Sequence, residues 1–450
     1  MDTEERERDE PESSGVGGSA GTGRPDRTPK VTLRTILADG PVRTAMVGTF
    51  VAMLGFGMVG PVLPLFARSF GVGYGAVAVM ISAYALTRLV LDVVAGPVVK
   101  RMGERASATT GVLVTGVAGG LTAAAPTFAL AVVAWGAAGA GSALMFTAMY
   151  SYLLKVVPET RRARTFSVFW GSLSVSFIAG APIGGALARI GLAVPLWAAA
   201  GMSVVAGWMF FRYLRNPPAR TVVDARRGGG HPLREMLRMR AFRAVLFINL
   251  GLFWLFAAIN TVVPLFAQRS LGLGTVGISA ALTVFVLTEL AVLYPAGIAS
   301  DRFGRKWLLV IGLLGLAITT AALGLTSEAV AFAVLLGVGG IASGVAGVSP
   351  PAMLGDLTPE DRSAVSVAAY RFCGDLGYVV GPLLAGITAQ FVGFAAAFVV
   401  AALPTFLSVL FLLSVPETRK RPPETAPPAA EHPASPLSAS EHPVTPAIPP

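Results

Sequence analysis

Long apolar stretches alternate with short polar clusters along most of the chain. A helix that crosses the hydrocarbon core of a bilayer needs about 20 mostly apolar residues, and stretches of this kind recur twelve times. We therefore predict an all-α membrane protein with twelve transmembrane helices. The predicted spans lie near 44–66, 74–98, 106–125, 127–154, 165–188, 192–213, 243–267, 275–299, 306–326, 328–354, 364–389 and 392–415.

The two ends of the chain and one central segment differ from the apolar stretches. The start is acidic, then Gly/Ser-rich, then basic, and lacks the apolar core of a signal peptide. The end is rich in Pro, Ala and Glu, a composition typical of disorder. We predict a disordered tail at 1–40, a six-helix half at 41–214, a linker at 215–242, a second six-helix half at 243–415 and a disordered tail at 416–450.

The basic residues gather on alternate connections between the spans. With the N-terminus inside, the external connections hold three basic residues, Arg68, Arg189 and Arg269, and the internal ones hold clusters such as Lys100-Arg101 and Arg305-Lys306. The positive-inside rule then predicts a multi-pass protein of the cell's inner (plasma) membrane with both termini cytoplasmic. Within the linker, residues 232–242 fit either a basic amphipathic helix on the inner membrane surface or a solvated connection.

An internal repeat divides the chain into two halves. The sequence Pro-Leu-Phe-Ala occurs at 64–67 and again at 264–267. After a one-residue insertion, an offset of 201 aligns Ala95-Gly96 with Ala296-Gly297, Pro158-Glu159 with Pro359-Glu360, and Gly180 with Gly381. Duplicated halves with a binding site between them are a design of secondary transporters.

The connection between spans 8 and 9 carries a motif. Residues 297–306 read GIASDRFGRK, in which glycines permit a tight turn and close helix approach. This stretch resembles the loop signature of the major facilitator superfamily. The matching residues are Gly297, Asp301, Arg302, Gly304 and Arg305. The resemblance covers about 44–415 and implies two six-helix bundles around a central cavity that works by alternating access.

The equivalent connection between spans 2 and 3 keeps only part of the signature. It retains Gly96, Arg101, Gly103 and Arg105, but Lys100 stands where the family has an aspartate. In the family that aspartate helps to latch the halves together on the cytoplasmic side, so the departure puts this latch in question.

Glycine and proline recur inside spans 5 and 11. The span 5 segment resembles the motif of drug–proton antiporters, with its proline displaced by one position, and it implies export. The alternative is that these residues only permit a kink and close packing. Trp135 in span 4 occupies the place of an arginine typical of the best-defined antiporters. The residues concerned are Gly180, Pro182, Gly184, Gly185, Gly381 and Pro382.

Four charged residues in spans 2 and 11 share one spacing. Arg88 and Asp92 are four residues apart, as are Arg371 and Asp375, so each pair lies on one helix face. At 1.5 Å rise per residue, Arg88 and Asp375 both lie roughly 15 Å from the inner ends of their spans, and Asp92 and Arg371 roughly 10 Å. We predict a neutral interdomain cluster of cross-pairs, formed when the cytoplasmic side is closed. It is either a conformational clamp or a solute-binding group.

Glu289 in span 8 is the repeat partner of Arg88 and has no basic neighbour within its own span. We expect it near mid-membrane, facing span 5. Because burial disfavours a carboxylate, such an acid can bind a proton in one conformation and release it in another. Glu289 is our candidate for proton coupling. The alternatives are a neutral structural acid and a cation site without coupling.

Composition narrows the function classes. The net charge of +10 arises from basic residues beside apolar spans, which argues against nucleic acid as a partner. The single cysteine, Cys373, excludes a disulfide framework, and the three histidines, His231, His432 and His442, lie outside the spans. We therefore expect no metal, no cofactor and no catalytic residues, and a membrane-embedded enzyme is disfavoured.

The combined features predict a monomeric secondary transporter in the lipid bilayer. Its predicted role is proton-driven efflux of a small amphipathic or hydrophobic compound, such as a drug or antibiotic, in a bacterium with a GC-rich genome. The alternative is uptake of a small metabolite or sugar, against which the spans offer few amides, chiefly Asn249 and Asn260. Aromatic candidates for the cavity wall are Phe56, Tyr150, Trp170 and Trp254.

Overall fold

The structure is a computed structural model, and it describes residues 39–157, 159–216, 232–358 and 363–415. The predicted disordered tails lie outside the described residues, as do Pro158, Pro359, Glu360 and Arg362 of the repeat and its loops. Within the described ranges, helices α2–α8 form the N-terminal half and α10–α15 the C-terminal half. The bounds are α2 Gly40–Val59, α3 Leu63–Arg68, α4 Tyr74–Met102, α5 Glu104–Ala123, α6 Phe128–Val156, α7 Glu159–Leu187, α8 Val194–Tyr213, α9 Pro232–Met236, α10 Arg240–Ser270, α11 Thr275–Phe303, α12 Arg305–Leu323, α13 Ala329–Leu357, α14 Ser363–Phe391 and α15 Phe394–Leu413.

The predicted membrane fold is confirmed. Eleven of the described helices are long and apolar enough to cross a bilayer. The remaining long helix, α7, contributes the apolar segment Gly171–Leu187. Together they give the twelve predicted spans, six in each half.

The first predicted span is broken where a continuous helix was expected. Helix α2 ends at Val59, and α3 resumes at Leu63. Pro61 and Pro64 each lack the backbone N–H that a helix interior needs, so two ladder bonds are lost within one turn. The repeat partner of Pro61 is Thr261, and α10 runs through that position without a break.

Both signature loops turn on a glycine with positive φ. Gly103 (φ 81°) separates α4 from α5, and Gly304 (φ 100°) separates α11 from α12. A residue with a Cβ is strained in this region, which explains the glycine in each half of the repeat. The predicted tight turns are therefore present at both places.

The segment 232–242 forms neither of the two predicted structures over its whole length. Helix α9 has five residues, and from Arg240 onward the chain already belongs to α10. Met236 is buried against the C-terminal half, and its sulfur lies 3.1 Å from the Ser366 hydroxyl. The end of the linker is thus packed onto that half.

The two halves share a hydrophobic core at one end of the molecule. We call the end where α2 begins and α15 ends the terminal face, and the opposite end the far face. Toward the far face, one buried cluster combines Leu63 and Ile81 of the N-terminal half with Leu255 and Phe285 of the C-terminal half. Packing across the halves runs through α4 with α14 and α7 with α11.

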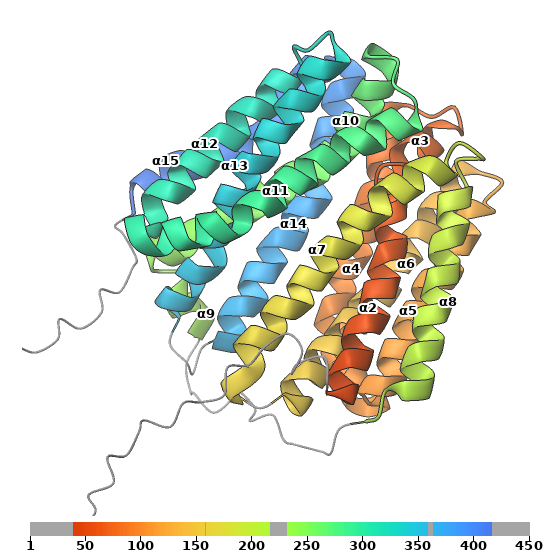
Figure 1. Ribbon diagram of the computed structural model, residues 1–450, viewed down its shortest axis with the longest axis vertical. Coiled ribbons are helices and arrows are strands. Elements are labelled where there is room, and N and C mark those ends of the chain that lie inside the picture. The colour runs from red at the N-terminus through yellow and green to blue at the C-terminus, as the bar shows by residue number, and fades with distance from the viewer. Residues whose placement is uncertain (1–38, 158, 217–231, 359–362, 416–450) are drawn as a thin grey trace, which may run out of the picture.

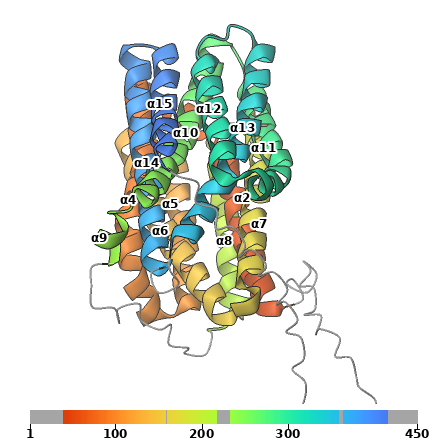
Figure 2. The ribbon, with the colours of Figure 1, turned by 90° about the vertical axis from the view of Figure 1, so that its left-hand side faces the viewer.

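Toward the terminal face the core divides. One buried cluster lies within the N-terminal half and includes Met46, Phe169 and Phe210. A separate cluster within the C-terminal half includes Phe242 and Leu313. The ribbons of α7 and α11 accordingly meet near the far face and diverge toward the terminal face (Figure 1), while the helices of both halves run along one common direction (Figure 2). Among the described residues, the buried apolar cluster that joins the halves lies toward the far face.

Candidate functional site

The four intramembrane charges come together between α4 and α14. Arg88 lies at the midpoint of α4, and its Nη2 is 3.6 Å from Oδ1 of Asp375. One turn further along α4, Oδ2 of Asp92 is 3.5 Å from Nη2 of Arg371. These are the two predicted cross-pairs, so the depth comparison placed all four residues correctly.

The pairs of this charge cluster are loosely bonded. Arg88 Nε and Asp92 Oδ1 are buried without a hydrogen-bond partner in the described part of the chain. The guanidinium of Arg88 lies 5.5 Å from the ring centre of Phe146. Arg371 lies 5.1 Å from the ring centre of Tyr150. The arginine side chains keep 28% and 32% of their surface exposed. Such pairs are complementary in charge but short of the hydrogen bonds that hold a buried ion pair firmly.

The cross-pairs are present in a conformation in which the halves diverge at the terminal face (Figure 1). That they form when the cytoplasmic side is closed stays a prediction. Far-face contacts join the same two helices: Ser82 Oγ donates to the Val379 carbonyl at 2.7 Å, and Gly75 N donates to Gln390 Oε1 at 2.9 Å. The charge cluster lies nearer the terminal face than these contacts. They hold it in place, because α4 and α14 already touch along the parts of both helices toward the far face.

Glu289 lies at the midpoint of α11. Its Oε1 accepts a hydrogen bond of 3.0 Å from the Ser343 hydroxyl of α13, and no cation pairs with it among the described residues. The prediction that it faces span 5 is wrong in detail. Helix α11 does contact α7, through Thr275 Oγ1 donating to the Gly185 carbonyl at 3.1 Å, but this contact is at the far-face end. At the midpoint of α11 the carboxyl group is bonded to α13 through Ser343, and a Cβ on Gly344 of the same helix would press on the Glu289 carbonyl.

A cavity lies between the halves where the shared core ends. We call it the central cavity. Its wall is largely aromatic and comes from seven helices of both halves, with Asn260 as its amide group. Aromatic rings and few polar groups suit an apolar or amphipathic ligand. The aromatic residues lining it are Phe56, Tyr84, Trp135, Phe177, Phe256 and Tyr378.

Of the four aromatic candidates from the sequence, only Phe56 lines this cavity. Tyr150 packs on Phe166 and lies under Arg371. Trp254 points into the C-terminal half, where its Nε1 donates to the Val400 carbonyl at 3.3 Å. The side chain of Trp170 lies outside the described residues.

The other lining aromatics were missed, although two signals pointed to them. Tyr84 is one helical turn from Arg88, on the face that meets the other half. Phe256 is the repeat partner of Phe56, at the offset of 200 set by the Pro-Leu-Phe-Ala match. A helix that is apolar on every side has no amphipathic pattern, so the sequence does not show which of its faces points to the cavity. For this reason the remaining rings could not be predicted.

The loop signatures hold an ion pair in each half, with opposite polarity. In the C-terminal half, Arg305 at the start of α12 pairs with Asp356 at the end of α13. At the same offset of 201, Glu104 at the start of α5 accepts from Lys155 Nζ of α6 at 2.5 Å and from the Ser151 hydroxyl at 2.8 Å. The N-terminal loop has therefore inverted its charges and kept the pair.

The first glycines of the signature do not serve close packing here. A Cβ on Gly96 would meet no atom within 4 Å, and one on Gly297 would only touch Val348 at 3.8 Å. Arg101 and Arg302 are exposed at the terminal face, and the side chain of Asp301 lies outside the described residues. In this conformation the close approach predicted for these two glycines is absent, because the helix ends around them are apart.

The glycines of spans 5 and 11 do allow close packing. A Cβ on Gly180 would press against the α2 backbone at Leu54, and one on Gly381 against the α10 backbone at Trp254. Gly184 packs on α2, and Gly185 packs on Ser279 of the opposite half. Pro182 and Pro382 lie inside α7 and α14, both of which continue through them. This supports the packing interpretation and leaves the transport direction untested.

Comparisons with known proteins agree with this architecture. The sequence matches the family described as Major Facilitator Superfamily over residues 45–282 and 246–447. It is 23% identical over 268 residues to Multidrug resistance protein 1 of Bacillus subtilis, covering 57% of this chain and 65% of that protein. It is 20% identical over 234 residues to Quinolone resistance protein NorA of Staphylococcus aureus, covering 52% and 60%. The matches thus span less than two thirds of these relatives' own length.

Two solved structures share the fold at low sequence identity. One is a bacterial homologue of the human lysosomal transporter Spinster in an inward-facing, occupied conformation (TM-score 0.68, 13% identity, 83% of this chain and 94% of that chain). The other is the nucleoside transporter NupG (TM-score 0.69, 11% identity, 83% and 98%). With the family match over both halves, the twelve spans and the central cavity, this chain belongs to the major facilitator superfamily of transporters.

Proposed function

We propose that this chain exports a small amphipathic or hydrophobic compound, such as a drug or antibiotic, in exchange for protons. The observation that carries the proposal is the aromatic central cavity at the point where the shared core ends. A compound entering between the diverging halves would reach an apolar wall with one amide, Asn260, as a hydrogen-bonding group. The resistance proteins to which the sequence is similar support the same substrate class.

The direction of access follows from loop charge. The terminal face carries the basic connections, and the positive-inside rule assigns that face to the cytoplasm. On this assignment we propose an inward-facing state of a monomer in the plasma membrane, with both termini cytoplasmic. Alternating access requires the far-face contacts of α4 with α14 to break while the terminal ends approach.

Glu289 is the proposed proton carrier. Its carboxyl has one neutral hydroxyl as a partner, Ser343, and no cation among the described residues to hold it ionised. A carboxyl in such surroundings binds a proton when the site is closed to water and releases it when water enters. The charge cluster acts as the clamp between the halves, because its long ion pairs can open without leaving one sign of charge in excess.

The test is transport by purified protein in liposomes under an imposed pH gradient, over a panel of drugs and metabolites. We expect gradient-driven accumulation of amphipathic drugs and none of sugars. Glu289→Gln should abolish the gradient-driven part and retain energy-independent counterflow. Glu328→Gln, which alters an exposed acid at the start of α13, is the matched control. Full gradient-driven transport by Glu289→Gln would refute the coupling role.

A further inference from the structure

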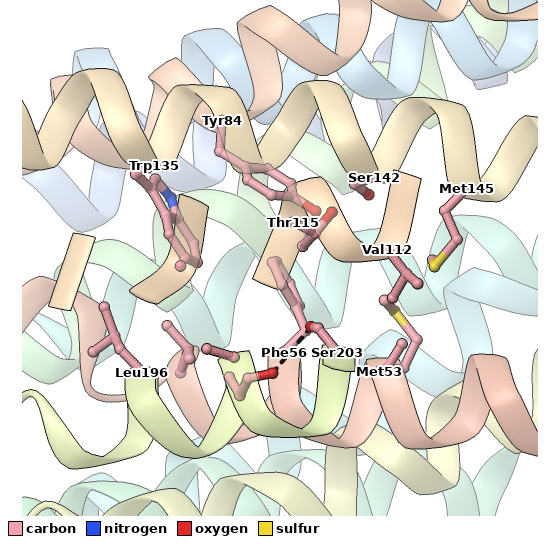
Figure 3. A pocket seen from close by; sticks show the side chains of 15 residues that line it. Met53, Phe56, Tyr84, Val112, Thr115, Trp135, Ser142, Met145, Leu196 and Ser203 are labelled. Carbon is pink, nitrogen blue, oxygen red and sulfur yellow. Dashed lines mark hydrogen bonds between the residues drawn. The ribbon is translucent and has the colours of Figure 1, made fainter. Parts of the chain in front are cut away.

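A second cavity lies inside the N-terminal half, between α2, α4, α5, α6 and α8 (Figure 3). We call it the side chamber and define it by Met53, Thr115, Gly119, Ser142, Met145 and Leu196. The wall is mostly apolar, so water gains little by filling it.

An aromatic partition separates the side chamber from the central cavity. Phe56, Tyr84 and Trp135 line both spaces. Their ring centres are close: 5.2 Å from Phe56 to Tyr84, 6.2 Å from Phe56 to Trp135 and 5.3 Å from Tyr84 to Trp135. A ligand that turned these rings aside would extend from one space into the other.

One hydrogen-bonding group in the chamber is unused. Ser142 is 1% exposed, and its hydroxyl has no hydrogen-bond partner among the described residues. The neighbouring hydroxyl is that of Tyr84. The Thr115 and Ser203 hydroxyls of the wall are satisfied: Thr115 Oγ1 donates to the Gly111 carbonyl at 3.0 Å, and Ser203 Oγ donates to the Ala199 carbonyl at 3.0 Å. An unsatisfied buried hydroxyl is unfavourable, and a hydrogen bond to a ligand atom would remove this cost.

The repeat explains why Ser142 is left alone. Its partner in the C-terminal half is Ser343, whose hydroxyl donates to Glu289. In the N-terminal half the residue equivalent to Glu289 is Arg88, and Arg88 turns to Asp375 across the interface. Ser142 thereby loses the partner that its counterpart keeps.

The repeat shows where the two halves differ around this space. Three wall positions carry a smaller residue than the C-terminal half: Ala52 for Leu252, Thr115 for Leu316 and Gly119 for Thr320. Leu316 is 1% exposed and part of the shared core. Three other wall positions carry the larger residue: Trp135 for Leu336, Met145 for Ala346 and Leu196 for Ala397. The side chains of the wall are thus arranged differently in the two halves, and the equivalent of Thr115 is filled core in the C-terminal half.

We propose that the side chamber receives an uncharged apolar arm of the transported compound and bonds it through the Ser142 hydroxyl. This rests on the proposed function and narrows its substrate class to bipartite compounds. One part stays in the central cavity, and the other is an aromatic or branched aliphatic group with a single hydrogen-bonding atom. Met53 and Met145 can change rotamer to admit arms of different shape, as methionines do at adaptable sites.

The site is tested without any gradient, so a failure of proton coupling does not affect the result. The probe is 1-naphthol, a neutral two-ring molecule with one hydroxyl. In a Cys373→Ser background, Ser142→Cys introduces a thiol in the chamber, and its modification rate by N-ethylmaleimide is measured with and without probe. At a probe concentration ten times its Kd, the rate should fall about tenfold, in proportion to the unoccupied fraction. A thiol that stays unmodified, or one that the probe does not protect, would overturn the proposal.

A filling variant supplies the second measurement. Thr115→Leu installs the residue of the C-terminal half and should remove the thermal stabilisation of the protein by 1-naphthol. Thr110→Leu makes the same change on an exposed position of α5 and should leave that stabilisation intact. Equal stabilisation of the two variants would show that the probe binds elsewhere. If the probe binds as expected but no compound is exported under a gradient, the chamber stands and the proposed function fails.

Discussion

The two halves of the molecule pack their second and fourth helices against each other in the same way. Where α4 crosses α6, a Cβ on Gly139 would press on the Tyr84 carbonyl, and where α11 crosses α13, a Cβ on Gly340 would press on the Phe285 carbonyl. Both pairs are related by the offset of 201. The backbone contact is therefore duplicated together with its glycine, because only a missing Cβ lets the helices come this close.

The side chains carried on this common backbone differ sharply. At equivalent positions of the repeat, Arg88 in the N-terminal half corresponds to Glu289 in the C-terminal half. The ion pair of Glu104 and Lys155 likewise has the reverse polarity of the pair formed by Arg305 and Asp356. A low-dielectric interior penalises an unpaired charge but is indifferent to which partner is positive. The comparison shows that both halves keep the close backbone approach and the loop ion pair, whereas the polarity of that pair and the charge at the midpoint of the second span differ.

The largest expected effect is on transport when Glu289, the repeat equivalent of the ion-paired Arg88, is replaced. Glu289→Gln should bring gradient-driven uptake into inverted vesicles to background, because an amide cannot release a proton. Glu289→Asp should retain reduced coupling, since the shorter side chain still titrates. Counterflow in the same vesicles reports whether the variants fold. Loss of counterflow together with uptake would assign Glu289 a structural role.

The inverted ion pair gives the next effect. Lys155→Asp or Glu104→Arg alone should destabilise the protein by about 3–5 kcal/mol, because each leaves like charges in a buried site. The double variant, which copies the polarity of the C-terminal half, should recover most of this loss. The measurement is thermal unfolding in detergent, read as a double-mutant cycle. Additive losses in the double variant would show that the two residues act independently.

Exchange within the charge cluster should have an intermediate effect. Arg88→Asp should impair transport, because it places three acids against Arg371. Adding Asp375→Arg restores one ion pair between α4 and α14 and should restore part of the transport rate. If the exchange variant transports no better than the single one, Arg88 contacts the substrate rather than serving the clamp.

The smallest effect tests the shared backbone contact. Gly340→Ala should destabilise by about 1–3 kcal/mol, as overpacking does. Gly347→Ala on the same helix should be neutral or stabilising by up to about 1 kcal/mol, because its Cβ meets nothing within 4 Å. Thermal unfolding of the two variants side by side checks this. Equal values would mean that α11 and α13 can move apart without cost.

Much of the fold could be predicted from the chain alone. Bilayer thickness sets the length of an apolar span, so the twelve spans followed from hydropathy. The helical rise per residue sets the depth of each side chain in the membrane. The sequence alone therefore matches Arg88 with Asp375 and Asp92 with Arg371. The internal repeat identified the two halves, because each retains the glycines its helix crossings need.

Other features were decided by the tertiary structure. Which end of the molecule is joined depends on how two apolar surfaces fit together. The partner of Glu289 and the rings that line the central cavity depend on helix rotation, which a helix apolar on every side does not encode. The side chamber arises where residues of five helices meet at one place. Only packing brings those positions together, and so only the folded chain shows a hydroxyl at Ser142 without a partner.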